Sequence, residues 1–160
     1  MEADSSIVDE FRIGAESCDL ASSASSQDEL FEQAGHLARS LGVTDDASGL
    51  ARDLRAREHE MPTGLMDEFA IPHAKSELVK KPSVLYLRTE HPIPWHMLDG
   101  NAAQHFFVLL VSPKDEGAPF VGMLSKLATC LMDPDFRSRV SGEINSTALG
   151  RYLNERIAQA

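Results

Sequence analysis

The longest uninterrupted apolar run of the chain extends from Phe106 to Val111. It has the length of a buried β-strand and falls far short of the roughly 20 residues that cross a bilayer. Two other segments in the middle of the chain, Phe69 to Ile71 and Ser83 to Thr89, are short and rich in apolar, β-branched or aromatic residues. The sequence therefore predicts strands in the middle of the chain, the most apolar of them over Gln104 to Val111.

The chain before and after these strands has helical periodicity instead. A first helix is expected to begin near Asp28 and to stop at Gly42, and a second to follow the cap residues Thr44 to Asp46 and to end before Pro62. The apolar stripes of these two helices are Leu30, Phe31, Ala34, Leu37, Ala38 and Leu41, and Leu50, Ala51, Leu54 and Ala56. The segments expected to be helical after the strands are 123–131, 136–140 and 147–157. Helices, strands and helices in this order indicate an α/β or α+β sandwich.

The length of the chain suits a single domain. With 160 residues, of which 42% are hydrophobic and 25% charged, it can bury one substantial core but not two. We expect residues 1 to 16 to form a flexible N-terminal segment and residues 17 to 160 to form the domain. The first residues, Met1 to Asp4, are acidic and polar where a secretory signal would be basic and then apolar, so a cytoplasmic protein is expected.

The charge of the chain excludes several classes of partner. Fifteen Lys and Arg stand against 25 Asp and Glu, a formal net charge of −10, so long-range attraction to nucleic acid or to an anionic membrane is missing. The two cysteines, Cys18 and Cys130, have no CxxC spacing and no cluster of further ligands. Neither a metal site nor a disulfide framework is therefore expected, and both thiols are expected to be reduced.

Two neighbouring segments carry the residues with the clearest chemistry. Arg57 to Gly64 reads Arg-Glu-His-Glu-Met-Pro-Thr-Gly, and Phe69 to Ser76 reads Phe-Ala-Ile-Pro-His-Ala-Lys-Ser. A short apolar strand that ends in Pro-His, preceded by Arg-Glu and Pro-Thr-Gly, resembles the fructose/mannitol class of bacterial phosphotransferase system (PTS) enzyme IIA domains, the EIIA type-2 domains. The resemblance continues, in the same order, through Pro92 to Trp95, Leu98 to Gly100, Phe106 to Pro113 and Leu124 to Ala128.

This resemblance implies a fold, an activity and two partners. The implied fold is a single three-layer α/β sandwich, with a mixed sheet of about five strands flanked by helices, as in the phosphotransferase/anion transport protein-like fold. The implied activity is that of a phosphotransferase: the chain would take a phosphoryl group from the phosphocarrier HPr and donate it to a cysteine of a IIB component during sugar uptake, with a fructose-like sugar favoured. That relay requires no metal, nucleotide or other cofactor.

The matching position for the phosphorylated histidine is His73. A neutral imidazole is nucleophilic near pH 7 and can hold a labile phosphoryl group on nitrogen, and Pro72 would fix the backbone beside it. Phosphoryl transfer asks the protein mainly for positioning and for cationic or hydrogen-bonding groups around the phosphoryl oxygens. Arg57 and Thr63 are the candidates for these contacts, together with the backbone amides after His73.

The sequence departs from the family at one place. Members of this class usually carry a second histidine just before the Leu-Ser-Lys-Leu helix, whereas the matching place here is Phe120, which donates no hydrogen bond to a phosphoryl oxygen. His59 and His96 are the candidates to replace it. The departure keeps two alternatives open: a regulatory IIA-like domain, of the nitrogen-regulatory branch or a degenerate paralogue, that controls a partner through its phosphorylation state, and an inert binding module.

Overall fold

The computed structural model describes residues 11–115 and 117–160. A five-stranded mixed sheet runs through this part of the chain. Its strands are β1 (Cys18–Ser22), β2 (Phe69–Ala70), β3 (His73–Lys75), β4 (Ser83–Pro94) and β5 (Ala102–Val111). β4 and β5 pair antiparallel, β1 runs parallel to β4, and β2 and β3 both run parallel to β5. The long β4–β5 pair is therefore the middle of the sheet, and β3 lies at its edge.

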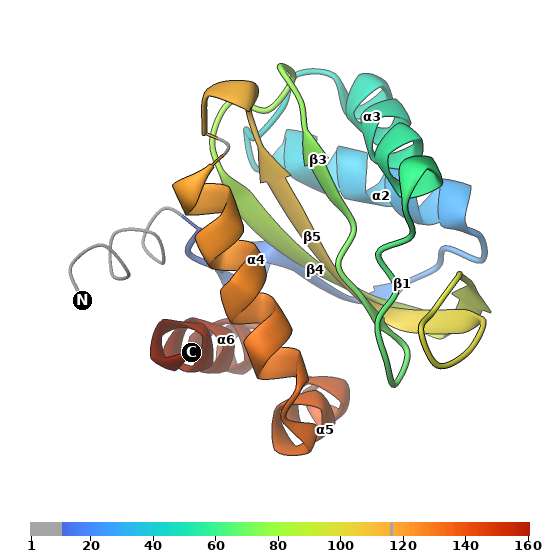
Figure 1. Cartoon of the computed structure of the whole chain (residues 1–160), viewed down its shortest axis with the longest axis vertical. Coiled ribbons are helices and arrows are strands. Elements are labelled where there is room, and N and C mark those ends of the chain that lie inside the picture. Colours follow the sequence, from blue (N-terminus) through green and yellow to red (C-terminus); the bar gives the residue numbers. More distant parts are fainter. Residues whose placement is uncertain (1–10, 116) are drawn as a thin grey trace.

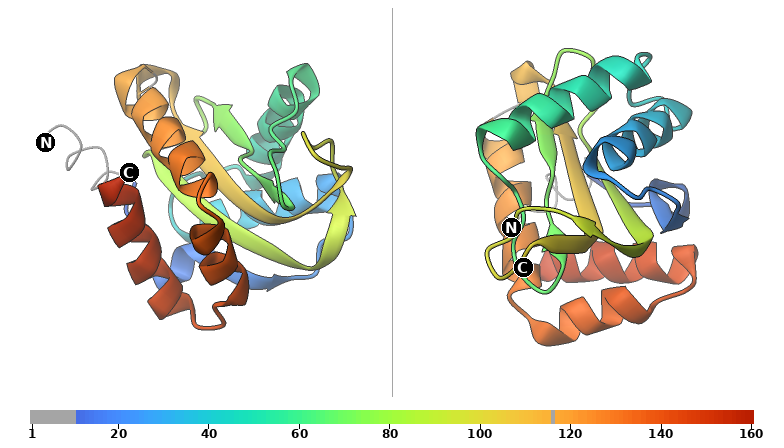
Figure 2. Two further views of the ribbon diagram at one scale, coloured as in Figure 1. Left: turned by 60° about the horizontal axis from the view of Figure 1, so that its bottom comes forward. Right: turned by 90° about the vertical axis from the view of Figure 1, so that its right-hand side faces the viewer.

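Helices cover both faces of this sheet (Figure 1). One face carries α2 (Gln27–Ser40) and α3 (Ala47–Glu60), and the other carries α4 (Ala118–Leu131), α5 (Pro134–Gly142) and α6 (Ser146–Gln159). Two short 3₁₀ turns, η1 (Ala15–Ser17) and η2 (Pro113–Asp115), precede β1 and α4. The two views of Figure 2 show the three layers from other sides. The predicted three-layer α/β sandwich with a mixed sheet is thus confirmed.

Strand β5 explains why the most apolar run of the sequence is in the middle of the fold. Successive side chains of a strand point to opposite faces of the sheet. Phe106, Val108 and Leu110 accordingly belong to the core under α2 and α3. Phe107, Leu109 and Val111 belong to the core under α4, α5 and α6. A strand that is buried on both faces needs apolar residues at every position, which is the pattern that the sequence shows.

The two N-terminal helices begin and end as their capping residues predict. The side chain of Ser26 accepts a hydrogen bond from the N–H of Glu29 (3.2 Å), and that of Asp46 accepts one from the N–H of Gly49 (2.9 Å). Both contacts satisfy backbone donors that the first turn of a helix leaves unpaired. Gly42 follows α2 with a φ of 75°, a left-handed conformation that glycine adopts at little cost.

Two features differ from the expectation. β1 was not predicted, because its sequence Cys-Asp-Leu-Ala-Ser shows neither an apolar run nor a clear alternation. The predicted strand over Phe69 to Ile71 is shorter in the structure, because β2 ends at Ala70, and a further strand that was not predicted, β3, begins at His73. His73 is therefore the first residue of an edge strand.

The N-terminal segment is described from residue 11. Residues 1–10 of the segment that we expected to be flexible lie outside the described residues. Phe11 and Ile13 are buried, and Asn154 of α6 exchanges two hydrogen bonds with the backbone of Ile13 (2.9 and 2.8 Å). The domain boundary at residue 17 stays a prediction. None of the helices in the described ranges has the length and apolar character needed to span a membrane.

Candidate functional site

His73 is the first residue of β3 and pairs with Leu109 of β5. The residue is 8% exposed, and its Nδ1 lies 2.9 Å from the carbonyl oxygen of Ile71. A carbonyl oxygen only accepts hydrogen bonds, so this contact places the proton of the neutral ring on Nδ1. Nε2 then carries the lone pair.

Nε2 of His73 reaches the molecular surface. Among the described residues, every buried side-chain nitrogen or oxygen has a hydrogen-bond partner. The only hydrogen bond of the His73 ring to these residues is the one from Nδ1 to Ile71. Nε2 therefore belongs to the atoms that solvent, or a phosphorus atom, can approach. The backbone of β3 and the Ile71 carbonyl hold the ring in the orientation that this requires.

The surroundings of His73 keep its ring neutral. Burial is the main cause that lowers the pKa of His73 below its ordinary value of 6.5, because it disfavours the charged imidazolium. The positive charges of Arg57 and Lys75 lower this pKa further, and the hydrogen bond to Ile71 opposes them. The ring is therefore a neutral nucleophile at pH 7.

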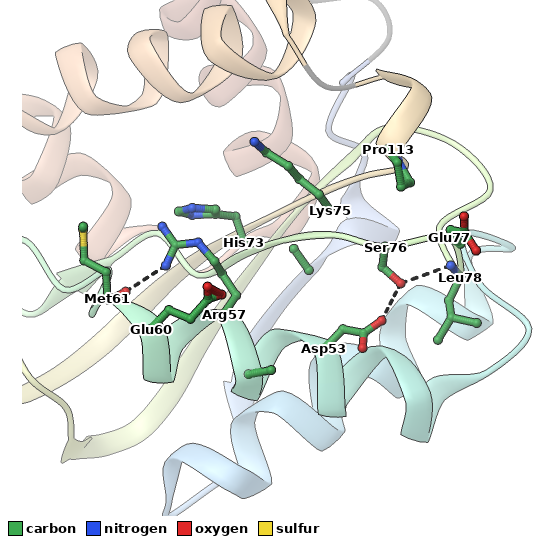
Figure 3. Close-up of a pocket in the computed structure, with 12 residues that line it drawn as sticks. Asp53, Arg57, Glu60, Met61, His73, Lys75, Ser76, Glu77, Leu78 and Pro113 are labelled. Atoms are coloured by element: carbon green, nitrogen blue, oxygen red, sulfur yellow. Dashed lines mark hydrogen bonds between the residues drawn. The ribbon is translucent and has the colours of Figure 1, made fainter.

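An open pocket of about 900 Å³ lies beside His73, between the C-terminal half of α3 and the edge strand β3 (Figure 3). Two of its lining residues, Arg57 and Lys75, are cationic. Nη1 of Arg57 donates to the carbonyl oxygen of Met61 (2.9 Å), which orients the guanidinium at the mouth of the pocket. The lining also includes the carboxylates of Asp53, Glu60 and Glu77, so the pocket as a whole is not cationic. Two cations next to a neutral, surface-accessible imidazole nitrogen nevertheless provide the groups that a phosphoryl-binding site needs.

Phe120 contacts both His73 and Lys75. This residue is in the first turn of α4, and its ring centroid lies 5.5 Å from that of the His73 ring. Nζ of Lys75 lies over the same Phe120 ring, 4.6 Å from its centroid. This distance is within the range of a cation–π interaction. The side chain at the place of the family's second histidine therefore holds an ammonium group near His73.

Thr63 does not line the pocket that contains His73. Its N–H donates to Oε2 of Glu58 (2.7 Å), and its hydroxyl donates to Oε1 of the same carboxylate (2.5 Å). Nε1 of Trp95 donates to Oε2 as well (3.1 Å). The geometry therefore gives no support to the predicted contact between the Thr63 hydroxyl and a phosphoryl group, because the hydroxyl is already used by Glu58.

Thr63 is connected to His73 through the backbone instead. Its carbonyl oxygen accepts a hydrogen bond from the N–H of Ile71 (3.1 Å), the residue whose own carbonyl oxygen contacts Nδ1 of His73. Glu58 follows Arg57 in α3 and is buried. The buried carboxylate of Glu58 thus fixes the loop after α3 that supports His73. Glu58 and Arg57 are neighbours in the same helix.

Two residues of the site were not identified from the sequence. Lys75 follows His73 by two positions on a strand, which places both side chains on one face, and this spacing was the available signal. Glu58 was part of the Arg-Glu motif, but its partners Thr63 and Trp95 are defined only by the fold. The predicted substitutes His59 and His96 are both exposed and outside the pocket lining.

Comparison with known proteins is consistent with this site. Residues 13–155 match the sequence profile of the family described as phosphoenolpyruvate-dependent sugar phosphotransferase system, EIIA 2. The PTS system fructose-specific EIIA component of Haloferax volcanii is 35% identical over 104 residues, which are 65% of this chain and 67% of that protein. The 2-O-alpha-mannosyl-D-glycerate-specific EIIABC component of Escherichia coli is 28% identical over 117 residues, 72% of this chain but only 18% of that longer protein.

Solved structures show the same fold. Nitrogen regulatory protein IIA-Ntr from Neisseria meningitidis superposes with a TM-score of 0.78 at 26% identity, over 91% of this chain and 96% of that one. IIA mannitol from Escherichia coli, in its complex with phosphorylated IIB mannitol, superposes with a TM-score of 0.72 at 17% identity, over 94% and 99%. This chain therefore belongs to the EIIA type-2 family of the sugar phosphotransferase system, whose members are phosphotransferases that carry phosphohistidine in a phosphoryl relay.

Proposed function

We propose that this chain is the IIA component of a sugar phosphotransferase system, which accepts a phosphoryl group from HPr on Nε2 of His73 and donates it to a cysteine of a IIB component. The observation that carries the proposal is the state of the His73 ring. Nδ1 is fixed by the Ile71 carbonyl, while Nε2 is at the surface beside the Arg57 guanidinium. Membership of the family supplies the type of reaction.

Each half of the relay is a substitution at phosphorus. In the first half, the Nε2 lone pair forms a bond to the phosphorus of phospho-HPr while the bond between phosphorus and HPr breaks. In the second half, the thiolate of IIB forms a bond to the phosphorus, the bond to Nε2 breaks, and His73 returns to its neutral form. The proton stays on Nδ1 throughout and remains hydrogen-bonded to the Ile71 carbonyl, so the ring needs no tautomer change. Arg57 stabilises the charge of the phosphoryl oxygens.

Exposed apolar side chains beside the site support docking of protein partners. Met61 lines the pocket and is 64% exposed, and Val121, which follows Phe120 in α4, is 59% exposed. Exposed apolar groups near a functional site are typical of interaction surfaces. The Escherichia coli mannitol IIA, which has this fold, was solved as a complex with phosphorylated IIB. Both observations support a IIB component as the acceptor, and we propose that the exchange takes place in the cytoplasm.

The sugar is proposed from one relative. The Haloferax volcanii protein that matches this chain is named as fructose-specific, which supports a fructose-like sugar. In such a system the IIB and membrane components contact the sugar, so the present pocket needs to recognise only the phosphoryl group and the two partner proteins.

A regulatory role is the second candidate. The similarity to the nitrogen regulatory IIA-Ntr of Neisseria meningitidis, at 26% identity over most of both chains, supports it. Under this alternative, His73 is phosphorylated in the same way, but the phosphoryl group is not passed to a IIB cysteine. Instead, the phosphorylation state of His73 changes the binding of the chain to a target protein.

One experiment separates these candidates. The chain is incubated with phosphoenolpyruvate, enzyme I and HPr, and the acid-labile phosphate is followed by intact mass, with His73→Ala as the control. IIB components are then added. Labelling that depends on His73 and passes to a IIB cysteine supports the transport relay. Labelling that no IIB accepts favours the regulatory role, and absence of labelling with several HPr proteins favours an inert binding module.

A further inference from the structure

Strand geometry places Lys75 on the same side of the sheet as His73. The three residues of β3 alternate between the faces of the sheet. Ala74, between them, is 2% exposed and belongs to the core under α2 and α3. The side chains of His73 and Lys75 therefore point toward the opposite face, where Phe120 lies in the first turn of α4. Figure 3 shows Lys75 and Arg57 on two sides of the His73 ring.

The Phe120 ring restricts where the Lys75 ammonium can be. It packs against the His73 ring, with centroids 5.5 Å apart, and its face lies 4.6 Å from Nζ of Lys75. A lysine has a flexible four-carbon stem, and the contact with the Phe120 ring helps to place its ammonium. The same ring packs against His73, the residue to which the phosphoryl group would be attached.

The charge of a phosphohistidine gives this ammonium a function. The transferring phosphoryl group carries its negative charge on several oxygens, and proteins stabilise it with more than one cationic or hydrogen-bonding group. Arg57 is one such cation at the pocket. The imidazole of a second histidine is missing because Phe120 occupies that place, and neither His59 nor His96 lines the pocket. Lys75 is the other cation of the pocket lining.

We propose that Lys75 is a catalytic residue of the relay: its ammonium moves from the face of the Phe120 ring to an oxygen of the phosphoryl group on Nε2 of His73. This inference rests on the proposed phosphorylation of His73 and deepens it. No covalent bond to Lys75 forms, since the ammonium donates hydrogen bonds to the phosphoryl oxygens and releases them when the group leaves. Phe120 is then a positioning residue, whose ring face contributes to placing the ammonium beside His73.

The test uses substitutions that separate charge from shape. Lys75→Met keeps most of the stem and removes the charge, Lys75→Arg keeps the charge, and Phe120→Leu removes the ring that holds the ammonium. Lys81→Met is the matched control, because Lys81 is an exposed lysine outside the pocket lining. Circular dichroism checks that each variant is folded. Lys75 is itself exposed, so its replacement is not expected to disturb the core.

Two measurements read out the role of Lys75. The first is kcat/KM for phosphoryl transfer from phospho-HPr, which we expect to fall by about 10-fold or more in Lys75→Met, less in Phe120→Leu, and little in Lys75→Arg or Lys81→Met. The second uses protein phosphorylated chemically with phosphoramidate, so that it needs no HPr. A ³¹P NMR titration then gives the pKa of the phosphoryl group, which the nearby ammonium lowers. Lys75→Met should raise this pKa by about half a pH unit or more.

The two measurements keep this inference separate from the proposed function. The other charged groups of the pocket, Arg57, Asp53, Glu60 and Glu77, are unchanged in all these variants. If phospho-HPr does not label the wild-type chain but phosphoramidate does, the relay is contradicted while the ³¹P titration still tests Lys75. If Lys75→Met and Lys81→Met give the same kcat/KM and the same ³¹P titration as the wild type, the role of Lys75 is overturned.

Discussion

The buried carboxylate of Glu58 receives two hydrogen bonds from Thr63, one from the backbone N–H to Oε2 (2.7 Å) and one from the hydroxyl to Oε1 (2.5 Å). Glu58 is 5% exposed and Thr63 is 8% exposed. Hydrogen bonds to a charged group in such a place are stronger than ordinary ones, and a buried carboxylate that loses a donor is costly. The pair therefore fixes the chain between the end of α3 and the strand residues that hold His73.

Removal of the Thr63 hydroxyl is expected to destabilise the domain. Thr63→Val keeps the shape of the side chain but leaves Oε1 of Glu58 without this donor, which should lower the free energy of unfolding by roughly 1–3 kcal/mol. Thr63→Ser keeps the hydroxyl and should lose much less. Urea denaturation followed by circular dichroism measures both. Equal stabilities of the Val and Ser variants would show that the hydroxyl does not stabilise the fold through Glu58.

Glu58→Gln tests whether the same contact positions His73. An amide NH₂ in place of one carboxylate oxygen faces a donor of Thr63 or Trp95, so the loop that supports Ile71 should shift. We expect a lower rate of His73 phosphorylation and a changed ¹⁵N chemical shift of the His73 ring in the folded protein. Glu155→Gln, at an exposed position of α6, is the control. An unchanged His73 ring signal in folded Glu58→Gln protein would contradict a positioning role.

The pH dependence of phosphoryl acceptance should follow the His73 ring. Burial lowers its pKa below 6.5, and Arg57 and Lys75 act in the same direction. Only the neutral ring is a nucleophile, so the rate should stay constant from pH 8 down through about 6.5 and fall only below the lowered pKa. NMR titration of the His73 ring should give a midpoint below 6.5. Arg57→Gln removes one positive charge and should raise this midpoint. A midpoint of His73 at or above 6.5 in the wild type would be inconsistent with the burial that the structure shows.

His105 should make the fold sensitive to acid. It is buried in β5, its Nδ1 lies 2.8 Å from the hydroxyl of Tyr86, and burial together with the charge of Arg88 lowers its pKa to about 4. The unfolded chain binds a proton near pH 6.5 but the folded one does not, so stability is unaffected above that pH and is lost as the pH falls toward 4. The loss amounts to roughly 3 kcal/mol at most.

The measurement for His105 is the slope of stability against pH. Urea denaturation of the wild type and of His105→Gln between pH 7 and pH 4.5 compares the two slopes, since the absolute stability also changes when a buried side chain is replaced. The variant should lose less stability over this range than the wild type. Parallel pH profiles would show that His105 titrates at an ordinary pKa in the folded protein.

Local patterns in the sequence were sufficient to predict the helices and the central strands, and with them an α/β or α+β sandwich, whereas the three layers and the mixed sheet were expected from the family resemblance. The alternating burial of β5 requires apolar residues on both faces, and the caps at Ser26 and Asp46 define the starts of α2 and α3. β1 could not be predicted, because only its parallel pairing with β4, far along the chain, makes Cys18 to Ser22 a strand.

The site was less predictable than the fold. The Ile-Pro-His segment was sufficient to identify His73. The roles of the residues around His73 could not be predicted, because they depend on contacts between segments that are distant in the sequence. Thr63 was a candidate for a phosphoryl contact because it is part of the Pro-Thr-Gly segment that carries the family resemblance. The fold instead directs its hydroxyl to Glu58, where Trp95 from another part of the chain also donates. Trp95 is buried, and its hydrogen bond to Glu58 has no signature in the sequence.

The relation between Lys75 and Phe120 leads to a last prediction, about a double variant. If Lys75 supplies the contact that a second histidine makes in relatives, then Phe120→His should restore transfer that Lys75→Met has lost. An imidazole N–H at position 120 can donate to a phosphoryl oxygen, which the Phe120 ring cannot do. We expect Lys75→Met/Phe120→His to recover several-fold in kcat/KM with phospho-HPr relative to Lys75→Met.

The control for this rescue is Lys75→Met/Phe120→Leu, which changes the size of the side chain without adding a donor. Its kcat/KM should be no higher than that of Lys75→Met alone. Neither of these two variants has a cation or hydrogen-bond donor besides Arg57 to contact the phosphoryl oxygens. Phe120→His by itself should change transfer little, since Lys75 still provides its charge although it loses the ring face at 4.6 Å. An equal recovery of kcat/KM in the two double variants would mean that space at position 120, and not a hydrogen-bond donor, limits transfer. Recovery only in Lys75→Met/Phe120→His would show that an imidazole at position 120 can replace Lys75 as the group that contacts the phosphoryl oxygens.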